Sequence, residues 1–247
     1  DVFKYELTPK NYVKTIMLVG GVHGNEYTAM YGVCHFLRLL ADTNEKSPIL
    51  NYIRENVRVV AIPLVNPWGF ANSIRQNSRG VDLNRNHDYL WENYNTELSS
   101  SGKPNYKGTA PYSEKETQYI KQVVESISDD LVGYLDCHNI VSVDAEHIYY
   151  APRHHTQRND LIASVIHHLN KNGDRVIWGT GKSPTSYSYV SDRYNVTAGT
   201  PEWRDGLHDN PMSSVEMTKI VEWFSNLAIK LASIETNSNS DFIDDSF

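Results

Sequence analysis

Short apolar runs alternate with longer amphipathic segments along most of this chain. The apolar runs have the length and composition of buried strands, and they are Thr15–Val19, Val57–Val65, Leu131–Asp136, His147–Tyr150 and Val196–Thr200. The other segments repeat their apolar residues with a helical period, and they are Tyr27–Leu40, Ser113–Ser126, Asn159–Asn170 and Ser213–Ile234. We therefore predict an α/β fold, in which a mixed, mostly parallel twisted β-sheet carries helices on both faces.

Two of the predicted helices carry a start signal. Ser113 is followed three residues later by Glu116, and Ser213 is followed in the same way by Glu216. In such a capping box the serine side chain accepts a backbone hydrogen bond while the glutamate reaches back. We expect the two helices to begin at these serines.

The length and composition fit one domain over residues 1–235. The chain has 247 residues, of which 40% are apolar and 21% are charged, and a single α/β domain of this size can bury a full core. Residues 236–247 are polar and acidic, and we expect a tail or linker there. Because the chain begins at Asp1 without a signal-peptide pattern, we expect it to be a fragment of a longer protein.

The charge balance and the hydropathy argue against two classes of partner. Lys and Arg number 23 against 30 Asp and Glu, which gives a net charge of −7. A nucleic-acid-binding protein needs a basic face, so we expect no nucleic-acid partner. No apolar run approaches the roughly 18 residues that span a membrane, so we expect no membrane span. Two cysteines, Cys34 and Cys137, make no disulfide framework and leave the compartment open.

Two of the predicted strands lead into residues that bind zinc in other proteins. After Val19, two glycines precede His23 and Glu26, which are three residues apart, and the strand that ends at Asp136 leads into His138. Ligand sites in open α/β sheets lie beyond the carboxyl ends of the strands, and a catalytic zinc takes three protein ligands. The alternatives are a surface histidine beside a helix-start glutamate and a histidine that caps a strand. We predict one zinc ion bound by His23, Glu26 and His138.

The segment from Asn66 to Asn86 concentrates arginines in an otherwise acidic protein. It contains Arg75, Arg79 and Arg85 among several asparagines. One interpretation is a solvated basic loop, and the other is a carboxylate clamp, because the planar guanidinium matches a carboxylate. Asp82 in the same segment can accept a hydrogen bond from a metal-bound histidine.

Taken together, these motifs resemble the M14 zinc carboxypeptidase family. They follow the family's order over about residues 14–225, and they are His23-x-x-Glu26, Asn66-Pro-x-Gly69, Arg75, Gly80-Val-Asp-Leu-Asn-Arg-Asn86, Ser113-Glu-x-Glu116-Thr117, Asp136-x-His138 and Glu202-x-Arg204-Asp205. The compact spacing from Arg75 to Asn84 is most similar to bacterial peptidoglycan-peptide amidases of this family, which cut γ-D-glutamyl–diaminopimelate bonds.

The resemblance implies roles for the site residues. One Zn²⁺ per chain would be bound by His23, Glu26 and His138, with Asp82 supporting a zinc-bound histidine. Arg75 would stabilise the oxyanion, and Glu202 would act as general base and then as general acid. The remaining residues would contact the substrate, and they are Asn84 and Arg85 at its terminal carboxylate, with Tyr187 and Tyr189 nearby. Both tyrosines have an alternative reading as ordinary strand residues.

The resemblance also implies an activity and a substrate class. We expect a zinc-dependent metallocarboxypeptidase that hydrolyses a peptide or γ-glutamyl amide bond next to a free terminal carboxylate, in a peptide or muropeptide. One alternative is a zinc deacylase of N-acyl amino acids, although the arginine motif of such enzymes usually lacks the Gly80-Val81 lead-in. The other is an inactive, metal-retaining binding module, against which the retained Glu202 and metal ligands argue. A secreted or cell-wall-associated location is favoured over a cytoplasmic one.

Overall fold

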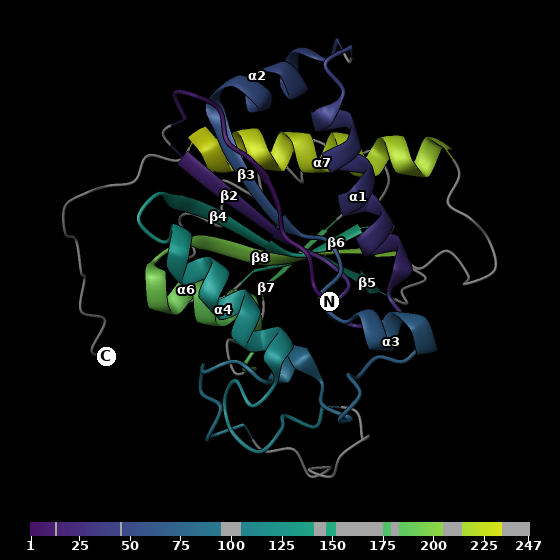
Figure 1. Cartoon of the computed structure of the whole chain (residues 1–247), viewed down its shortest axis with the longest axis vertical. Helices are drawn as coiled ribbons and strands as arrows, with labels where there is room; N and C mark the ends of the chain where they lie inside the picture. Colours follow the sequence, from purple (N-terminus) through teal and green to yellow (C-terminus); the bar gives the residue numbers. More distant parts are fainter. Residues whose placement is uncertain are drawn as a thin grey trace.

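The structure, a computed structural model, describes residues 1–12, 14–44, 46–94, 105–140, 147–151, 175–178, 183–204 and 214–233. A central β-sheet with helices on both faces dominates this part of the chain (Figure 1). The strands are β1 (Tyr5–Leu7), β2 (Lys14–Val19), β3 (Val57–Ile62), β4 (Leu131–Asp136), β5 (His138–Ile140), β6 (His147–Ala151), β7 (Arg175–Trp178) and β8 (Thr197–Arg204). The helices are α1 (Tyr27–Ala41), α2 (Pro48–Asn56), α3 (Pro67–Asn72), the short 3₁₀ helix η1 (Leu83–Arg85), α4 (Lys115–Ile127), α6 (Ser186–Tyr194) and α7 (Ser214–Ser233).

The described strands form one mixed sheet in the order β1-β3-β2-β4-β8-β6-β7, with β5 also paired to β8. The central strands β3, β2, β4 and β8 run parallel to one another. Strand β1 pairs antiparallel with β3, and β6 pairs antiparallel with β8. The predicted mixed, mostly parallel sheet is therefore confirmed.

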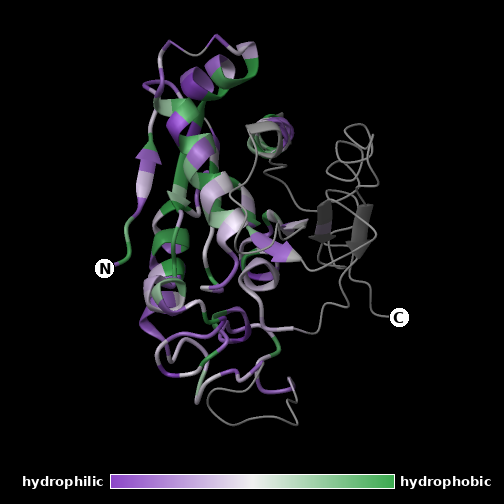
Figure 2. Ribbon diagram, turned by 90° about the vertical axis from the view of Figure 1, so that its right-hand side faces the viewer, coloured by the Kyte–Doolittle hydropathy of each residue, from purple (hydrophilic) through white to green (hydrophobic). Residues whose placement is uncertain are grey.

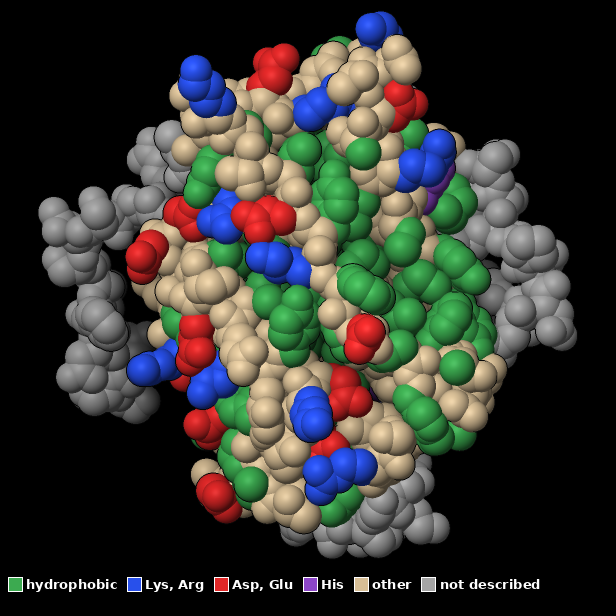
Figure 3. All heavy atoms as spheres, viewed as in Figure 1, with side chains coloured by type: hydrophobic (Ala, Val, Ile, Leu, Met, Phe, Trp, Pro, Cys, Tyr) green, Lys and Arg blue, Asp and Glu red, His purple; other side chains and the backbone are tan. Residues whose placement is uncertain are grey.

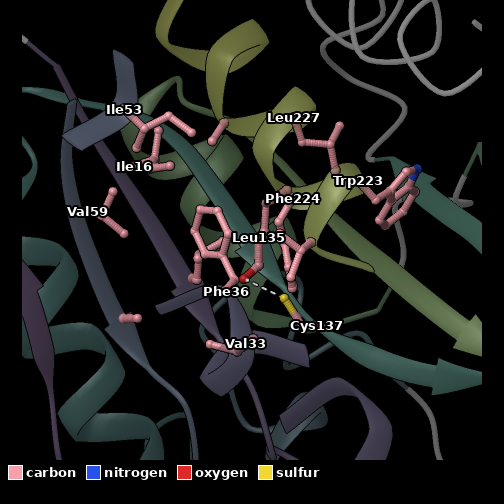
Figure 4. Packing of buried hydrophobic residues seen from close by; sticks show 14 of the residues in the cluster. Ile16, Val33, Phe36, Ile53, Val59, Leu135, Cys137, Trp223, Phe224 and Leu227 are labelled. Carbon is pink, nitrogen blue, oxygen red and sulfur yellow. Dashed lines mark hydrogen bonds between the residues drawn. The ribbon is translucent and has the colours of Figure 1, made fainter. Parts of the chain in front are cut away.

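The sheet separates two clusters of buried apolar side chains. Along β2, Ile16 and Leu18 point to the cluster under α1, α2 and α7, whereas Met17 and Val19 point to the cluster under α4 and α6. Phe36 of α1 and Phe224 of α7 pack over this first face of the sheet (Figure 4). Because both faces are covered, the strands are continuous apolar runs rather than alternating ones.

The surfaces of the helices are more polar than the sheet. Seen from the side, hydrophilic and apolar residues alternate along the helices, as expected for amphipathic segments (Figure 2). On the face seen in Figure 3, Lys and Arg side chains are interspersed with Asp and Glu rather than gathered into one basic patch. Among the described residues, no helix combines the length and the apolar composition that crossing a lipid bilayer requires.

Several predicted elements have different ends in the structure. The strand predicted to reach Val65 ends at Ile62, before Pro63, and the strand predicted to stop at Thr200 continues to Arg204. Helices α2, α3, η1 and α6 and strands β1, β5 and β7 were not predicted. Two of these helices have a readable start, because Ser47 caps α2 and Asn66 caps α3, and each cap is followed by a proline. The helix predicted over 159–170 and the tail over 236–247 lie outside the described residues.

The capping box predicted at Ser113 is wrong. Helix α4 begins at Lys115 with Glu114 as its N-cap, and no side chain caps it. The Ser113 hydroxyl instead donates to the Glu114 carboxylate at 2.7 Å, while the side-chain amide of Asn77 donates to Glu114 at 2.7 Å and lies 3.5 Å from Glu116. Tertiary partners have thus replaced the local capping pattern. The second predicted box begins at Ser213, outside the described residues.

The close approach of β4 to α7 at Gly133 is testable by mutation. A Cβ atom added at Gly133 would lie 2.6 Å from Leu231 Cδ1 and 2.9 Å from Leu231 Cβ. We expect Gly133→Ala to lower the free energy of unfolding by about 1–3 kcal/mol, measured by urea denaturation. In a Leu231→Ala background the same substitution should cost less, because most of the obstructing side chain is gone. An equal cost in both backgrounds would assign the effect to another contact.

Candidate metal centre

The ends of two neighbouring strands bring the predicted metal ligands together. Strands β2 and β4 are parallel, and Val19 pairs with Asp136 at their carboxyl ends. His23 follows β2 in a loop, and His138 begins β5 two residues after Asp136. Glu26 is the N-cap residue of α1. The two histidines therefore leave the sheet at the same edge.

The loop that carries His23 and Glu26 packs tightly on α3. A Cβ atom added at Gly24 would overlap the backbone of Gly69, so only glycine fits at this position. The backbone N–H of Asn139 donates to Glu26 Oε2 at 3.1 Å and fixes the carboxylate from the opposite side. The loop and the start of β5 together set the position of the Glu26 side chain.

The donor atoms of the three residues face one another. Glu26 Oε1 lies 2.7 Å from His23 Nδ1, Glu26 Oε2 lies 2.7 Å from His138 Nδ1, and the two Nδ1 atoms are 3.0 Å apart. All three ligand atoms lie within 4.8 Å of one another. Two imidazoles and one carboxylate are the donor set of a catalytic zinc site with one open position. The residues present therefore fit a zinc ion.

The Nε2 atom of each histidine, which points away from the cluster of donor atoms, lies near a buried carboxylate. His23 Nε2 lies 3.0 Å from Asp82 Oδ1, and His138 Nε2 lies 3.0 Å from Asp136 Oδ1. Such partners hold the proton on the outer nitrogen and leave Nδ1 as the acceptor that a metal requires. The predicted support of a histidine ligand by Asp82 has the required contact in the structure. Asp136 is fully buried.

The electrostatics of the centre favour a cation. Burial lowers the pKa of His138, but Asp136 and Glu26 outweigh burial and hold that pKa well above its usual value. Burial raises the pKa of Glu26, yet the two imidazoles lower it well below the usual range. A site that stabilises positive charge on His138 also stabilises a metal ion between the same groups.

Arg75 lies directly beside the predicted metal ligands. Its Nε donates to Asp82 Oδ2 at 3.0 Å, and its Nη1 donates to Glu26 Oε1 at 3.2 Å. The Arg75 guanidinium thus contacts the predicted ligand Glu26 and also Asp82, the carboxylate beside His23. About a third of the Arg75 side chain is exposed, so this guanidinium is also accessible from solvent.

Asn84 and Arg85 lie next to the centre, on η1. The Asn84 side chain is buried, with Nδ2 at 3.0 Å from His138 Nε2 and Oδ1 accepting from the Ser186 N–H at 3.0 Å. Arg85 donates from Nη1 to the Asn84 carbonyl at 2.7 Å and from Nε to Tyr94 Oη at 2.9 Å. Burial lowers the pKa of Arg85, but the Asp82 carboxylate raises it, so this guanidinium stays charged.

The two predicted substrate tyrosines lie on helix α6, so the alternative reading as strand residues is wrong. Tyr189 is buried in the second apolar cluster, with its ring centroid 5.4 Å from Tyr112 and 5.9 Å from Tyr194. Tyr187 has a different environment, because burial raises its pKa while the Arg85 guanidinium lowers it. The structure brings Tyr187 near Arg85 and places Tyr189 in the core.

Glu202 reaches the centre from β8. Its Cα pairs with that of His138 in the parallel ladder between β5 and β8, and its side chain is partly buried. Burial raises the pKa of the Glu202 carboxyl to about 7, with His138 and Arg75 opposing and Glu26 reinforcing the shift. A carboxyl that titrates near neutral pH can both accept and return a proton.

A match to a family model identifies the family of this chain. A model described as zinc carboxypeptidase, Peptidase_M14, matches residues 6–213, which include every residue of the centre. The chain belongs to the M14 zinc carboxypeptidase family. The resemblance inferred from the ordered motifs is therefore confirmed.

Curated relatives in this M14 family include members named as inactive. Inactive metallocarboxypeptidase ecm14 from Talaromyces marneffei is 26% identical over 144 residues, which cover 51% of this chain and 24% of that protein. Carboxypeptidase B from Helicoverpa zea is 27% identical over 146 residues, which cover 52% of this chain and 33% of that protein. The chain thus spans about a quarter to a third of the length of these relatives.

Solved structures of M14 proteins confirm the fold. Thrombin activatable fibrinolysis inhibitor matches with a TM-score of 0.78 at 17% identity, covering 94% of this chain and 65% of that chain. Murein-tripeptide amidase MpaA from Escherichia coli O157 matches with a TM-score of 0.56 at 18% identity, covering 95% of this chain and 87% of that chain.

Sequence reasoning did not foresee how the asparagines of the M14 motifs work. Asn66 accepts from the Gly69 N–H at 2.8 Å and donates to the Gln76 carbonyl at 3.0 Å. Asn86 donates to the Lys107 carbonyl at 2.8 Å. These side chains anchor the loop from inside, so the loop is not simply a solvated basic segment. The signal available in the sequence was an asparagine beside turn residues, as in Asn66-Pro67, because asparagine side chains often bond to the backbone of a turn.

The metal centre predicts a specific pattern of zinc binding. We expect the purified chain to bind one zinc ion, and His138→Ala to weaken binding by more than about 100-fold, since loss of even a supporting residue costs about 10–100-fold. Competition with a chelator measures the affinity. His35→Ala, at a partly exposed position on α1, is the matched control and should leave the affinity unchanged. Stoichiometric binding that survives His138→Ala would place the metal elsewhere.

Proposed function

We propose that this M14 protein is a zinc-dependent carboxypeptidase, which hydrolyses an amide bond next to a free terminal carboxylate. Glu202 carries the proposal. Its partly buried carboxyl, with a pKa raised to about 7, pairs in register with a metal ligand, and Arg75 lowers its pKa from the same site. A carboxylate with a purely structural role would not require a raised pKa beside the predicted metal ligands.

Each step of the proposed reaction has a residue of this chain to perform it. When bound by His23, Glu26 and His138, zinc supplies Lewis acidity, which polarises a carbonyl and lowers the pKa of water. Glu202 accepts the proton of the attacking water and later donates it to the leaving amine. The Arg75 guanidinium, which contacts Glu26 and is partly exposed, is available to the developing oxyanion.

Recognition of the terminal carboxylate is proposed for Arg85, with Asn84 and Tyr187 beside it. The Arg85 guanidinium is charged and largely shielded from water, which strengthens its attraction for an anion. Its Nη1 and Nε bonds go to a backbone carbonyl and a phenol rather than to a carboxylate. This arrangement leaves the positive charge available to a carboxylate of the substrate. Tyr189, buried in the core, is not part of this proposal.

Within this class, we propose a muropeptide with a γ-glutamyl amide bond as the first substrate to test. The compact spacing between Arg75 and Asn84 supports it, and so does the match to 87% of the murein-tripeptide amidase chain. Two other functions remain alternatives. A deacylase of N-acyl amino acids would use the same centre. An inactive metal-binding module is suggested by the relatives named as inactive, although this chain retains Glu202.

The role of Glu202 is tested by an isosteric substitution. Glu202→Gln removes the proton acceptor but keeps the shape, so we expect kcat to fall by about 10²–10⁴. Zinc content and the thermal unfolding midpoint should stay unchanged. Glu222→Gln, on the exposed side of α7, is the matched control. Activity within about tenfold of wild type would remove Glu202 from the mechanism.

The substrates in this experiment also separate the alternatives. A free-carboxyl peptide, a muropeptide and an N-acyl amino acid are each assayed with and without a chelator. Hydrolysis of either peptide that the chelator abolishes supports the proposal. Hydrolysis of the N-acyl amino acid alone supports the deacylase, and zinc binding without any hydrolysis supports the inactive module.

The two arginines are expected to differ in which kinetic constant they control. Losing a buried charge partner costs about 3–5 kcal/mol, so Arg85→Ala should raise KM about 100-fold or more for free-carboxyl peptides. Peptides with a C-terminal amide should change much less. Arg75→Ala should act mainly on kcat, by about 10²–10³, because the oxyanion charge exists only in the transition state.

Steady-state kinetics on matched free and amidated peptides checks both expectations. Arg79→Ala, at a largely exposed position of the same loop, controls for a general loss of positive charge. Equal losses on free and amidated peptides for Arg85→Ala would show that this residue does not bind the carboxylate.

A further inference from the structure

Three buried side chains surround the outer nitrogen of His138. Asp136 Oδ1 and Asn84 Nδ2 each lie 3.0 Å from His138 Nε2. Ser186 connects these two neighbours, because its hydroxyl donates to Asp136 Oδ2 at 2.5 Å and its backbone N–H donates to Asn84 Oδ1 at 3.0 Å. All four residues are at most 5% exposed. They form a closed ring of polar contacts.

The ring joins segments that are distant in the sequence. Asp136 ends β4, His138 begins β5, Asn84 lies on η1, and Ser186 is the first residue of α6. Ser186 is the only one of the four that contributes both a side-chain and a backbone donor to these ring contacts. The position of Ser186 therefore fixes both groups that face His138 Nε2.

The two neighbours of His138 Nε2 make opposite demands on the imidazole. Asn84 presents an N–H donor, because the Ser186 N–H already occupies its oxygen. This donor favours an unprotonated Nε2 and hence a proton on Nδ1, the nitrogen that faces the metal ligands. Asp136 presents an acceptor, which favours a proton on Nε2 and a free lone pair on Nδ1. Only the second tautomer can bind a metal through Nδ1, the nitrogen that faces His23 and Glu26.

The Ser186 hydroxyl favours the second tautomer by fixing the Asp136 carboxylate. Its bond to Oδ2 leaves Oδ1, which has no hydrogen-bond partner among the described residues, free to accept at 3.0 Å from His138 Nε2. A charge-assisted bond to a carboxylate is stronger than one to a neutral amide. Without this hydroxyl, a fully buried carboxylate oxygen loses its donor, which is costly in an interior that excludes water. The carboxylate can then turn away from His138.

We propose that Ser186 is a positioning residue of the metal centre, which orients Asp136 so that His138 presents an unprotonated Nδ1 to zinc. This role rests on the proposed function only in its choice of zinc as the metal. It requires no turnover, so it holds equally for an active carboxypeptidase and for an inactive zinc-binding module.

Zinc affinity of the full chain, measured by chelator competition, tests the role. Ser186→Ala should weaken zinc binding by about 10–100-fold, the usual effect of losing a residue that orients a metal ligand. Asp136→Asn should weaken it at least as much, because its amide would place a second donor against His138 Nε2. Ser186→Thr retains the hydroxyl and should keep the affinity closer to wild type than Ser186→Ala does.

Ser191→Ala is the matched control. Ser191 is as buried as Ser186 and lies on the same helix, but five residues place it on a different face. The Ser191→Ala variant should bind zinc with the affinity of wild type. Thermal unfolding of the zinc-free variants should show that all of them are folded.

The outcomes separate this role from the proposed function. A wild-type chain that binds zinc but hydrolyses nothing overturns the proposed function alone. Ser186→Ala or Asp136→Asn with an affinity within threefold of wild type overturns the positioning role alone. Equal losses for Ser186→Ala and Ser191→Ala also overturn it, because they would reflect the packing of α6. A wild-type chain that binds no zinc overturns both.

Discussion

The parallel pairing of β2 with β4 is the constraint on which the metal centre depends. Val19 and Asp136 are paired at the ends of these strands, and the Cys137 N–H donates to the Val19 carbonyl at 2.8 Å. Level strand ends are what allow His23 and His138 to meet at one edge of the sheet. A slip of one residue would turn the side chains of a strand to the opposite face. Because both faces of the sheet are apolar, the close packing of individual side chains, rather than exposure to water, opposes such a slip.

The cost of this arrangement is two fully buried carboxylates. An ionised carboxylate inside a protein is tolerated only when donors satisfy it. Asp82 accepts from Arg75 at 3.0 Å and from the Asn84 N–H at 3.0 Å, while Asp136 accepts from Ser186. The donors come from loops and helix starts rather than from the sheet itself. The surrounding connections are therefore as much a part of the metal centre as the ligands are.

How far the sequence predicts this structure depends on whether a signal is local. Strands β2, β3, β4, β6 and β8 were predictable from their apolar runs, whereas β1, β5 and β7 were not. The grouping of His23, Glu26 and His138 was also predictable, because apolar runs that lead into His23 and His138 mark the edge of an α/β sheet. Ser186 was not, because its partners Asp136 and Asn84 lie 50 and 102 residues away. No local pattern distinguishes a serine that begins a helix from one that orients a metal-centre carboxylate. The substrate contact predicted for Tyr189 is not supported for a different reason. Tyr189 is only two residues from Tyr187 in the sequence, but it packs in the apolar core.

The elements divide the tasks of the proposed reaction among different parts of the chain. Metal binding belongs to the segments after β2 and β4, whereas Glu202 comes from β8. Proton transfer can therefore be lost while the metal is kept, and a family built this way can contain both active and inactive members. Carboxylate recognition is less independent. Asn84 and Ser186 lie next to Arg85 and Tyr187 in sequence, and the bond between them also braces His138. The proposed carboxylate site and the proposed metal ligand His138 are therefore joined by the single hydrogen bond between Asn84 Nδ2 and His138 Nε2.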